Sequence, residues 1–598
     1  MNNIITKMIT EQIRQAAKQA IESLYNISLT YKDIQINDTK PEFEGDYTLV
    51  LFAFIRQLKK SPEQLGNEIG EYLISHHPGL FSSYNIIKGF LNMTVHTHYW
   101  VDFLQKNFSN PAFGKKQPSG EKVMVEYSSP NTNKPLHLGH LRNIFLGWSI
   151  AEILKANGHE VVKTCIVNDR GIHICKSMIA WQIFSNGETP SGSGKKGDHL
   201  VGEYYVKFND EYKKQVKELM ASGISKEEAE KNAPVMKAAQ QMLLDWEAGK
   251  PGVIELWKKM NSWVYEGFEV TYKRIGSDFA KTYYESDTYL LGKKFVEDGL
   301  KQDVFFKKDD GSVWIDLTED GLDEKLVLRA DGTSVYITQD LGLAQQKYDD
   351  LHYNQSIYVV GDEQNYHFKV LKLILQKLKK PYASGLYHLS YGMVELPAGR
   401  MKSREGNVVD ADEMIDEMVS ISAKHTEELG KVKDFSEEEL NELYDTIGLG
   451  ALKFFLLRVD PKKRMIFNPE ESIDFHGFTG PFIQYTHARI KSILRKEKAD
   501  QSYRIKESGL LKLEKDLLFK MEQYSTIVEQ AATEHNPSVL AIYAFEVAKT
   551  FNSFYTEHSV MNAESGEKKQ LRLQLCELTA HVIASSMGML GIKVPERM

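Results

Sequence analysis

KVMVEYSSPNTNKPLHLGHLRN, residues 122–143, decides the fold, because it joins a strand pattern to a helix pattern through a short polar loop. Residues 122–129 have the pattern of a buried strand, and the apolar residues that begin with Leu138 recur at helical spacing until Gly158. The next stretch, EVVKTCIVND (160–169), has a second strand pattern. A strand, a helix and a strand in this order predict a parallel sheet covered by helices.

The bulk composition is that of a soluble globular protein with several domains, since 42% of its 598 residues are hydrophobic and 26% are charged. A formal net charge of −8 excludes a uniformly basic surface but allows a local basic face for nucleic acid. Three cysteines without a CxxC motif favour a reducing compartment, and no apolar run approaches the ~18 residues of a membrane span. We therefore predict a cytoplasmic protein without a membrane segment, in which residues 1–24 contribute an amphipathic helix and no targeting signal.

Changes in pattern along the chain predict three domains. Residues 1–115 mix helix and strand patterns, which indicates an N-terminal α+β domain that ends at the Gly-, Pro- and Lys-rich linker 110–120. A Rossmann-like α/β domain is expected at 116–440, with a mostly helical insertion at about 171–280, because strand patterns return only after it. From 441 to 598 the pattern is helical, so we expect an all-α C-terminal domain.

The loop before the first helix of the sheet carries candidate chemistry. His137 and His140 are three residues apart and share one face of the first helical turn. The free N–H groups of a helix start attract phosphate, Lys134 can reach anionic oxygens, and Gly139 leaves room for a flat ring such as adenine. Taken alone, the HxGH pattern is better explained as a helix start with two incidental surface histidines.

A second stretch, AGRMKSREGNVV (398–409), gathers three cations between two glycines after the strand pattern YGMVEL. Such cations suit a polyphosphate, because guanidinium donates paired hydrogen bonds and ammonium acts as a point charge. A solvated basic loop is the alternative, and on its own the better one. The candidate ATP-binding residues of this loop are Arg400, Met401, Lys402 and Ser403, and its candidate catalytic residues are Lys402 and Arg404.

The ordered pair HLGH and RMKSR resembles the two signatures of class I aminoacyl-tRNA synthetases. VEYSSPNTNKPLHLGHLRN is similar to the long first signature of the arginyl-tRNA synthetases in particular. DGTSVYITQDLGLA (331–344), YVVGDEQNYHF (358–368), FTGPFIQYTHARI (478–490) and GIKVPERM (591–598) are similar to further segments of that family. The resemblance covers the chain from about residue 120 to the end. It implies an arginine–tRNA ligase that forms arginyl-adenylate from ATP and L-arginine, transfers the arginyl group to the 3′ end of tRNA(Arg), and releases AMP and diphosphate.

The residue types agree with arginine as the amino acid. A guanidinium keeps its charge and presents five donors, so its pocket needs carboxylates and other acceptors. Asp340 lies four residues after Tyr336, on one face if this segment is helical, and the pair suits a guanidinium through carboxylate and ring. By resemblance, the amino and carboxylate groups of the substrate are held by Ser128, Asn131 and Gln364, with Glu126 assisting on the cationic side. Without the resemblance, Glu126 would be read as an edge-strand surface acid and Asp340 as a helix N-terminal acid.

The candidate tRNA contacts lie in the C-terminal part. Phe482, Tyr485 and Arg489 follow helical spacing, and rings combined with a guanidinium suit unstacked anticodon bases. Core packing explains Phe482 about as well. The resemblance to the family's anticodon-binding domain adds Met598 to these candidates.

The basic loop departs from the family pattern K-M-S-x-R-x-G. Arg400 stands in place of the first lysine, the second lysine is absent, and Ser403 and Arg404 cover its region. Which cation meets the α-phosphate is therefore open, and Lys134 is the alternative.

The resemblance implies ATP with Mg²⁺ as a substrate, arginine activation that requires tRNA, and no tightly bound metal or organic cofactor. Cys165, His173 and Cys175 lack a fourth ligand at suitable spacing, so no metal site is predicted. GSGKKGD (192–198) fails the spacing of a phosphate-binding loop and is expected at the surface. We predict a monomer. The alternatives are another class I synthetase, a small HxGH nucleotidyltransferase of coenzyme synthesis, and a catalytically inactive tRNA-binding relative.

Overall fold

The computed structural model describes residues 9–40, 42–397, 409–428, 434–506 and 509–598. The predicted fold class is confirmed: a parallel sheet with a helical insertion lies between an α+β N-terminal part and a helical C-terminal part. Within the described residues, no helix combines the length and the apolar character that crossing a bilayer demands.

The N-terminal part is an antiparallel sheet in the order β1-β2-β4-β3 with helices packed on it. Its elements are α1 (Ile9–Tyr25), η1 (Tyr31–Asp33), β1 (Ile36–Asp38), β2 (Tyr47–Val50), α2 (Phe52–Leu58), α3 (Pro62–His76), β3 (Phe81–Ile87), β4 (Phe90–Val95) and α4 (Thr97–Asn107).

Two stretches of alternating residues in this part change from strand to helix halfway. DYTLVLFAF divides into β2, which ends at Val50, and α2, which begins at Phe52. FLNMTVHTHYW divides in the same way into β4 and α4, and His96 caps α4 because its Nδ1 accepts a hydrogen bond from the backbone N–H of His98 at 3.3 Å. Alternation alone did not indicate where this cap ends the strand.

The central sheet has five parallel strands in the order β12-β11-β5-β6-β7. They are β5 (Lys122–Glu126), β6 (Glu160–Val167), β7 (Lys281–Tyr284), β11 (Gln355–Gly361) and β12 (Leu386–Tyr391). The chain runs outward from β5 to β7 and returns on the other side of β5, so the order reverses between β5 and β11. Open parallel sheets bind ligands outside the carboxyl ends of their strands at such a point. Because α5 (Leu138–Ala156) follows β5, the HxGH turn lies there.

The insertion and the elements between the later strands complete the catalytic part. Between β6 and β7 lie α6 (Ile172–Phe184), α7 (Pro190–Ser193), α8 (Gly197–Ala221), α9 (Lys226–Asn232), α10 (Pro234–Glu247) and α11 (Pro251–Ile275). Between β7 and β11 lie α12 (Glu285–Thr288), α13 (Lys293–Lys301), β8 (Phe306–Lys307), β9 (Val313–Ile315), η2 (Thr318–Asp320), β10 (Lys325–Leu328) and α14 (Tyr336–Leu351). After β11 come η3 (Asp362–Gln364) and α15 (Asn365–Lys377). β8, β9 and β10 form a small antiparallel sheet.

The C-terminal part is helical apart from one short strand pair. Its elements, with the strand that precedes them, are β13 (Val394–Glu395), α16 (Ala411–Glu428), α17 (Glu437–Leu457), β14 (Met465–Ile466), α18 (Pro469–Ser472), α19 (Gly480–Lys496), α20 (Lys512–Glu522), α21 (Tyr524–Thr533), α22 (Pro537–Glu557) and α23 (Gly566–Met589). β14 pairs with β13, which joins the chain after α17 to the catalytic part. The domain limits 1–115, 116–440 and 441–598 stay predictions.

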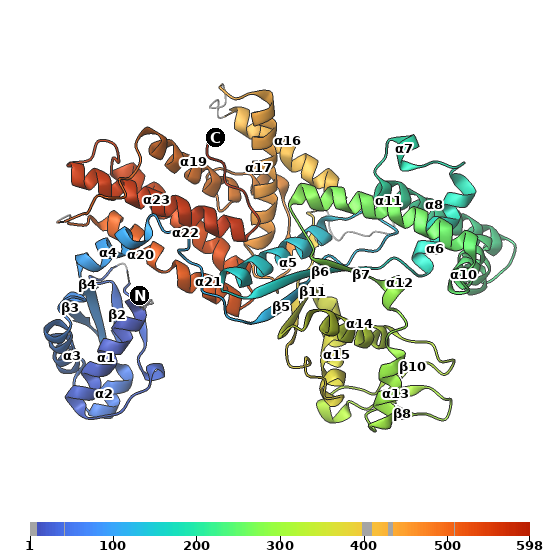
Figure 1. The fold of residues 1–598 in the computed structure, drawn as a ribbon, viewed down its shortest axis with the longest axis horizontal. Coiled ribbons are helices and arrows are strands. Elements are labelled where there is room, and N and C mark those ends of the chain that lie inside the picture. The colour runs from blue at the N-terminus through green and yellow to red at the C-terminus, as the bar shows by residue number, and fades with distance from the viewer. Residues whose placement is uncertain (1–8, 41, 398–408, 429–433, 507–508) are drawn as a thin grey trace.

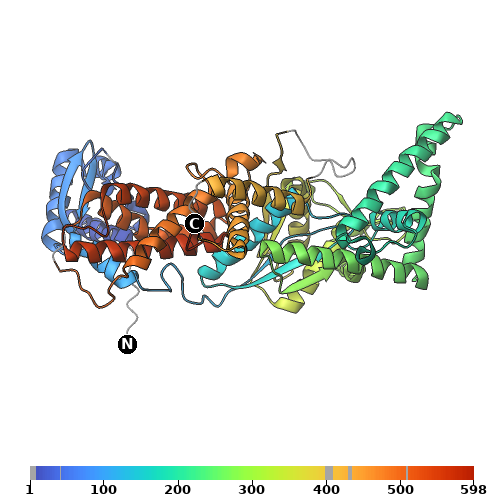
Figure 2. The same cartoon turned by 90° about the horizontal axis from the view of Figure 1, so that it is seen from above.

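The N-terminal part rests on the C-terminal helices. Figure 1 shows its blue elements beside α20 and α23, away from the insertion helices. The backbone N–H of Ile9 donates to a carboxylate oxygen of Glu522 at 2.9 Å, and the ring of Tyr47 lies 5.1 Å from that of Phe519. Figure 2 shows the N-terminal part and the insertion at opposite ends of an elongated molecule, with the sheet between them.

Candidate functional site

The HxGH turn is closed by its own two histidines. Nδ1 of His137, the N-cap of α5, accepts the backbone N–H of Gly139 at 3.1 Å, and Nδ1 of His140 accepts the backbone N–H of His137 at 3.1 Å. The proton of each neutral ring is therefore on Nε2. The centroids of the two rings are 3.9 Å apart. The turn thus presents two adjacent N–H donors that its own hydrogen bonds do not use.

Both imidazoles are neutral at physiological pH. Burial, followed by the charge of Lys134, lowers the pKa of His137 to about 3, against the opposite effect of Asp410. Burial, with His137 and Lys134, lowers the pKa of His140 well below its ordinary value. Two uncharged donors therefore stand near one ammonium at a helix start, which is an arrangement suited to phosphate oxygens.

The imidazole of His137 lies on the side of Gly139 where a side chain would be, and the contact of Gly139 with adenine stays a prediction. A Cβ at this position would lie 3.0 Å from Cε1 and 3.1 Å from Nδ1 of His137, so the imidazole already occupies this space. The missing side chain instead lets the ring reach the N–H of Gly139. On the other side, α8 packs closely on the loop, because a Cβ at Gly202 would lie 2.7 Å from Cδ of Pro135.

The chain that follows the basic loop is joined to the HxGH turn. The loop residues that we predicted to act on ATP, Arg400, Met401, Lys402, Ser403 and Arg404, lie outside the described residues. The backbone N–H of Leu138 donates to the carbonyl of Val409 at 3.2 Å, and that of Ala411 donates to the carbonyl of Leu136 at 3.0 Å. The downstream end of the basic loop therefore lies beside the first signature, as a shared nucleotide site requires.

A charged network at the start of α8 lies against the same segment. Nζ of Lys196 pairs with Asp412, and Nε2 of His199 lies 3.2 Å from a carboxylate oxygen of both Asp410 and Asp412. Asp198 is fully buried and lies 3.1 Å from Lys196. The predicted surface position of GSGKKGD is therefore wrong for its last residues, which belong to this network.

The network is not assigned to a metal. His199, Asp410 and Asp412 are close enough to share an ion. Hydrogen bonds to the two aspartates raise the pKa of His199 to about 10, so its ring is protonated, and a protonated ring does not ligate a metal. Burial alone would raise the pKa of Asp412, but hydrogen bonds from His199 and Lys196 lower it. The described cations thus already compensate the carboxylates.

A cavity of about 940 Å³ opens near the carboxyl end of β6 and the start of α14. Three of the six predicted arginine-binding residues, Asn131, Tyr336 and Asp340, line it. Tyr336 begins α14 and is 79% exposed, and Asp340 follows one turn later. Nε2 of His367 lies 2.6 Å from the carboxylate of Asp340. An exposed ring beside a fixed carboxylate suits a guanidinium.

Glu285 is a second acid of this cavity, and our reading of the sequence missed it. It directly follows β7, a four-residue strand that we did not recognise at the end of the insertion. Burial raises the pKa of Glu285 to about 7; Asp169 and Asp340 add to this shift, and Arg170 opposes it. The carboxylates of Glu285 and Asp340 therefore repel each other across one cavity, and a cation bound there would reduce this repulsion.

Glu126 and Ser128 are not among the residues that line this cavity, and their contact with arginine stays a prediction. Glu126 is buried and paired with Lys347 of α14, so it is not a surface acid. Ser128 is fully buried, and its Oγ lies 2.7 Å from the hydroxyl of Tyr272. Both side chains point inward from the end of β5, where they fix the loop that carries the HxGH turn.

Gln364 lies at the end of η3, directly after β11. Because β11 pairs with β5, Gln364 and Asn131 both follow strands that end at the same edge of the sheet. Gln364 is exposed there. Its contact with the amino acid stays a prediction.

A second cavity, of about 890 Å³, lies at α19 in the helical part, and Tyr485, Arg489 and Met598 line it. The guanidinium of Arg489 lies 4.9 Å from the ring centroid of Tyr485 and 5.5 Å from that of Tyr555. Three of the four predicted tRNA contacts are therefore brought together. Tyr555 was missed, since on α22 it is one aromatic residue among several.

Phe482 is not among the residues that line the second cavity. Its ring is half-buried, and its centroid lies 5.1 Å from that of Phe545. The alternative of core packing therefore describes its position.

Three family models together match most of the chain. The model described as "tRNA synthetases class I (R), catalytic domain" matches residues 104–468. "DALR anticodon binding domain" matches residues 483–598, and "Arginyl tRNA synthetase N terminal domain" matches residues 9–95. The first model covers both the HxGH turn and the first cavity, and the second covers most of the residues that line the second cavity.

Similar proteins match over their full length. An arginine–tRNA ligase of Flavobacterium psychrophilum is 52% identical over 603 residues, covering 99% of this chain and 100% of the relative. One of Parabacteroides distasonis is 51% identical over 598 residues, with the same coverage. Among solved structures, an arginyl-tRNA synthetase of Thermus thermophilus has a TM-score of 0.77 at 23% identity and covers 99% of this chain and 100% of that one. This last likeness concerns the fold.

Proposed function

The chain belongs to the family of class I arginyl-tRNA synthetases, and we infer that it is an arginine–tRNA ligase. It activates L-arginine with ATP to arginyl-adenylate, transfers the arginyl group to the 3′ end of tRNA(Arg), and releases AMP and diphosphate. The observation that carries this inference is the HxGH turn at the switch point of the sheet, joined to Val409 and Ala411, which follow the second signature in the chain.

Activation needs charge stabilisation and no general base. The carboxylate of arginine attacks the α-phosphorus of ATP, which enters together with Mg²⁺, and the bond to the bridging oxygen breaks as diphosphate leaves. Negative charge grows on the phosphoryl oxygens, and preplaced donors stabilise it without reorganising. These donors are the Nε2–H groups of His137 and His140 and the ammonium of Lys134. Lys402 and Arg404 stay predicted partners of the diphosphate.

The first cavity holds the amino acid in this proposal. Asp340 and Glu285 accept hydrogen bonds from the guanidinium, and the ring of Tyr336 packs against it. Asn131 and Gln364 hold the amino and carboxylate groups at the sheet edge. His367 is a positioning residue, because it fixes the carboxylate of Asp340 at 2.6 Å.

The second cavity binds anticodon bases in this proposal, with Tyr485, Arg489, Tyr555 and Met598 as contacts. Aromatic faces and a guanidinium plane are suited to unstacked bases. The division into an N-terminal, a catalytic and an anticodon-binding domain at 1–115, 116–440 and 441–598, the monomeric state and the cytoplasmic location stay predictions.

ATP–diphosphate exchange tests the function. We expect the purified protein to exchange labelled diphosphate into ATP with arginine and tRNA together, and with neither alone. Exchange with a different amino acid and none with arginine would refute the specificity. The variant His140→Ala should lower the exchange rate about 100- to 1,000-fold, the effect of losing one preplaced donor, while its affinity for tRNA is retained. Equal loss of exchange and tRNA binding would show that His140 supports the fold instead.

A further inference from the structure

Residues 593–598, which follow α23, lie along one face of α19 and are held there by its side chains. Nε2 of Gln484 donates to the carbonyl of Lys593 at 2.8 Å. One turn later, Nδ1 of His487 donates to the carbonyl of Pro595 at 2.9 Å. Two successive turns of one helix therefore bind the backbone of this segment.

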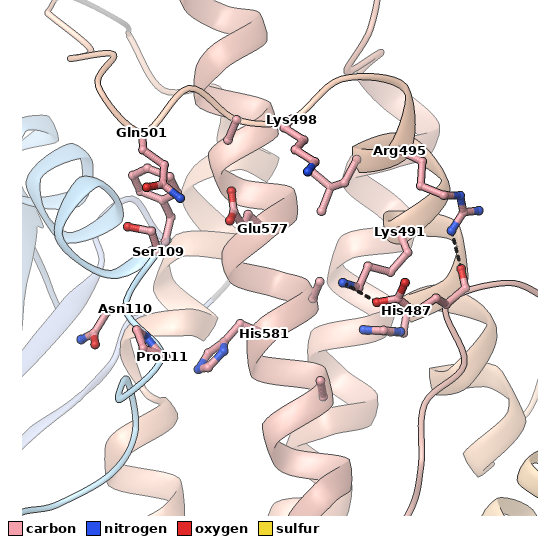
Figure 3. Close-up of a pocket in the computed structure, with 16 residues that line it drawn as sticks. Ser109, Asn110, Pro111, His487, Lys491, Arg495, Lys498, Gln501, Glu577 and His581 are labelled. Atoms are coloured by element: carbon pink, nitrogen blue, oxygen red, sulfur yellow. Dashed lines mark hydrogen bonds and ion pairs between the residues drawn. The ribbon is translucent and has the colours of Figure 1, made fainter.

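Two further side chains on the same face of α19 also bind this segment. Lys491 pairs with the carboxylate of Glu596 at 2.9 Å, and Arg495 donates to the carbonyl of Glu596 at 2.7 Å. Figure 3 shows both contacts beside His487. Positions 484, 487, 491 and 495 are three or four residues apart, which places them on one side of the helix.

The first two of these side chains, those of Gln484 and His487, are buried in the core. Gln484 is 0% exposed and His487 is 3% exposed. Gln484 also donates to the carbonyl of Thr446 on α17 at 3.0 Å, and Gly450 makes room for it, since a Cβ there would lie 2.4 Å from Nε2 of Gln484. Burial lowers the pKa of His487, so its ring is neutral with the proton on Nδ1. The loss of such a donor leaves a carbonyl unpaired in a place with little water.

The held segment ends in the second cavity, which Arg597 and Met598 line. The guanidinium of Arg597 lies 4.4 Å from the ring centroid of Phe435. Met598 packs with Tyr485 against the small apolar cluster between α17 and Phe475. Part of the wall of this cavity is therefore supplied by a segment that is held by Gln484 and His487, which do not line the cavity themselves.

We propose that Gln484 and His487 are positioning residues for tRNA discrimination. By holding the backbone at Lys593 and Pro595 they set Arg597 against Phe435 and Met598 beside Tyr485, where a base is bound. The inference rests on the proposed function of that cavity. His487 itself lines a different cavity of about 750 Å³ between α19, α23 and residues 108–111, so it acts on the base only through the segment (Figure 3).

The test compares His487→Leu with His487→Asn. Asparagine can place an N–H donor near the position of Nδ1, whereas leucine fills the space without a donor. We expect His487→Leu to raise KM for tRNA about three- to tenfold, the factor that one neutral hydrogen bond is worth. It should also lower the preference for the cognate tRNA over a transcript changed at one anticodon base. At saturating tRNA, kcat and KM for arginine and ATP should stay within twofold, and His487→Asn should recover most of the loss.

Two outcomes would overturn the proposal. Unchanged KM and unchanged discrimination in His487→Leu, while the wild type charges tRNA with arginine, would show that the segment needs no such holding. Lys498, two residues after the end of α19, lines the same cavity as His487. An equal loss in Lys498→Met would show that this cavity contacts tRNA directly. A wild type that does not charge tRNA with arginine refutes the proposed function instead, so the two failures are distinct.

Discussion

At the scale of single residues, the two acids of the first cavity predict a pH-dependent affinity for arginine. The pKa of Glu285 is about 7 in the free protein, mainly because the group is buried, and a guanidinium binds the ionised form. KM for arginine should therefore fall as the pH rises from 6 to 8. In Glu285→Gln this dependence should disappear, and KM should be about 10- to 100-fold higher, the range for a hydrogen bond to a charged group.

Asp331→Asn is the matched control for this prediction, because Asp331 lines the same cavity. Hydrogen bonds from Thr333 lower the pKa of Asp331, so its charge does not change between pH 6 and 8. We expect the control to keep the slope of KM against pH. A slope that survives in Glu285→Gln would assign the titrating group elsewhere.

Residue types were easier to predict than the directions in which side chains point. HxGH with its lysine, and Tyr336 with Asp340, could be read from spacing, because a helix turn brings residues three or four apart together. Glu126 ends β5 and Ser128 follows it by two residues, but both side chains are buried and contact Lys347 and Tyr272. Those partners come from distant elements, and no local pattern specifies them.

At the scale of elements, one ionic contact joins the start of α8 to the start of α16 beside the HxGH turn. Hydrogen bonds to Asp410 and then Asp412 raise the pKa of His199 from its ordinary value to about 10. A raised pKa means that the folded protein holds this proton more tightly than the unfolded chain. The stabilisation is therefore complete below about pH 6.5 and is lost as the pH rises through about 10.

His199→Gln tests this contact through thermal unfolding. We expect Tm to be lower than that of the wild type at pH 7 and the difference to shrink towards zero above pH 10. His173→Gln is a control on the neighbouring α6, because Nδ1 of His173 lies 3.0 Å from the hydroxyl of Tyr205. A difference in Tm that stays constant with pH in His199→Gln would mean that the ring acts by packing and not by charge.

The elements themselves were largely predictable where a pattern was long. α5 and the strands β5 and β6 follow from periodicity, and Ser436 with Glu439 forms a capping box at the start of α17. β7 has four residues and follows a long run of helices, so its pattern was too short to recognise. Missing β7 also meant missing Glu285, since the position of that acid depends on the end of the strand.

At the scale of the whole molecule, the sequence indicated the parts but not how they are joined. Lys453 on α17 connects two such parts to its own helix, because it is 7% exposed and donates to one carbonyl of each. Its Nζ lies 2.7 Å from the carbonyl of Ile275, at the end of the insertion, and 2.5 Å from that of Gly591, after α23. Neither partner is near Lys453 in the sequence, so periodicity alone predicts only a buried helix face.

Replacing Lys453 by methionine should destabilise the folded protein. Two buried carbonyls lose their donor, so we expect the free energy of unfolding at pH 7 to fall by about 1–3 kcal/mol, measured by urea titration.

Burial, with the charge of Lys593, lowers the pKa of Lys453 to about 7 in the folded protein. Between pH 7 and about 10.5 the unfolded chain therefore holds a proton that the folded one has released, and the wild type gains stability over Lys453→Met as the pH rises. Lys593→Met should move the onset of this gain to higher pH, because it removes a charge that opposes protonation. A difference between wild type and Lys453→Met that does not vary with pH would show that Lys453 stays charged in the fold.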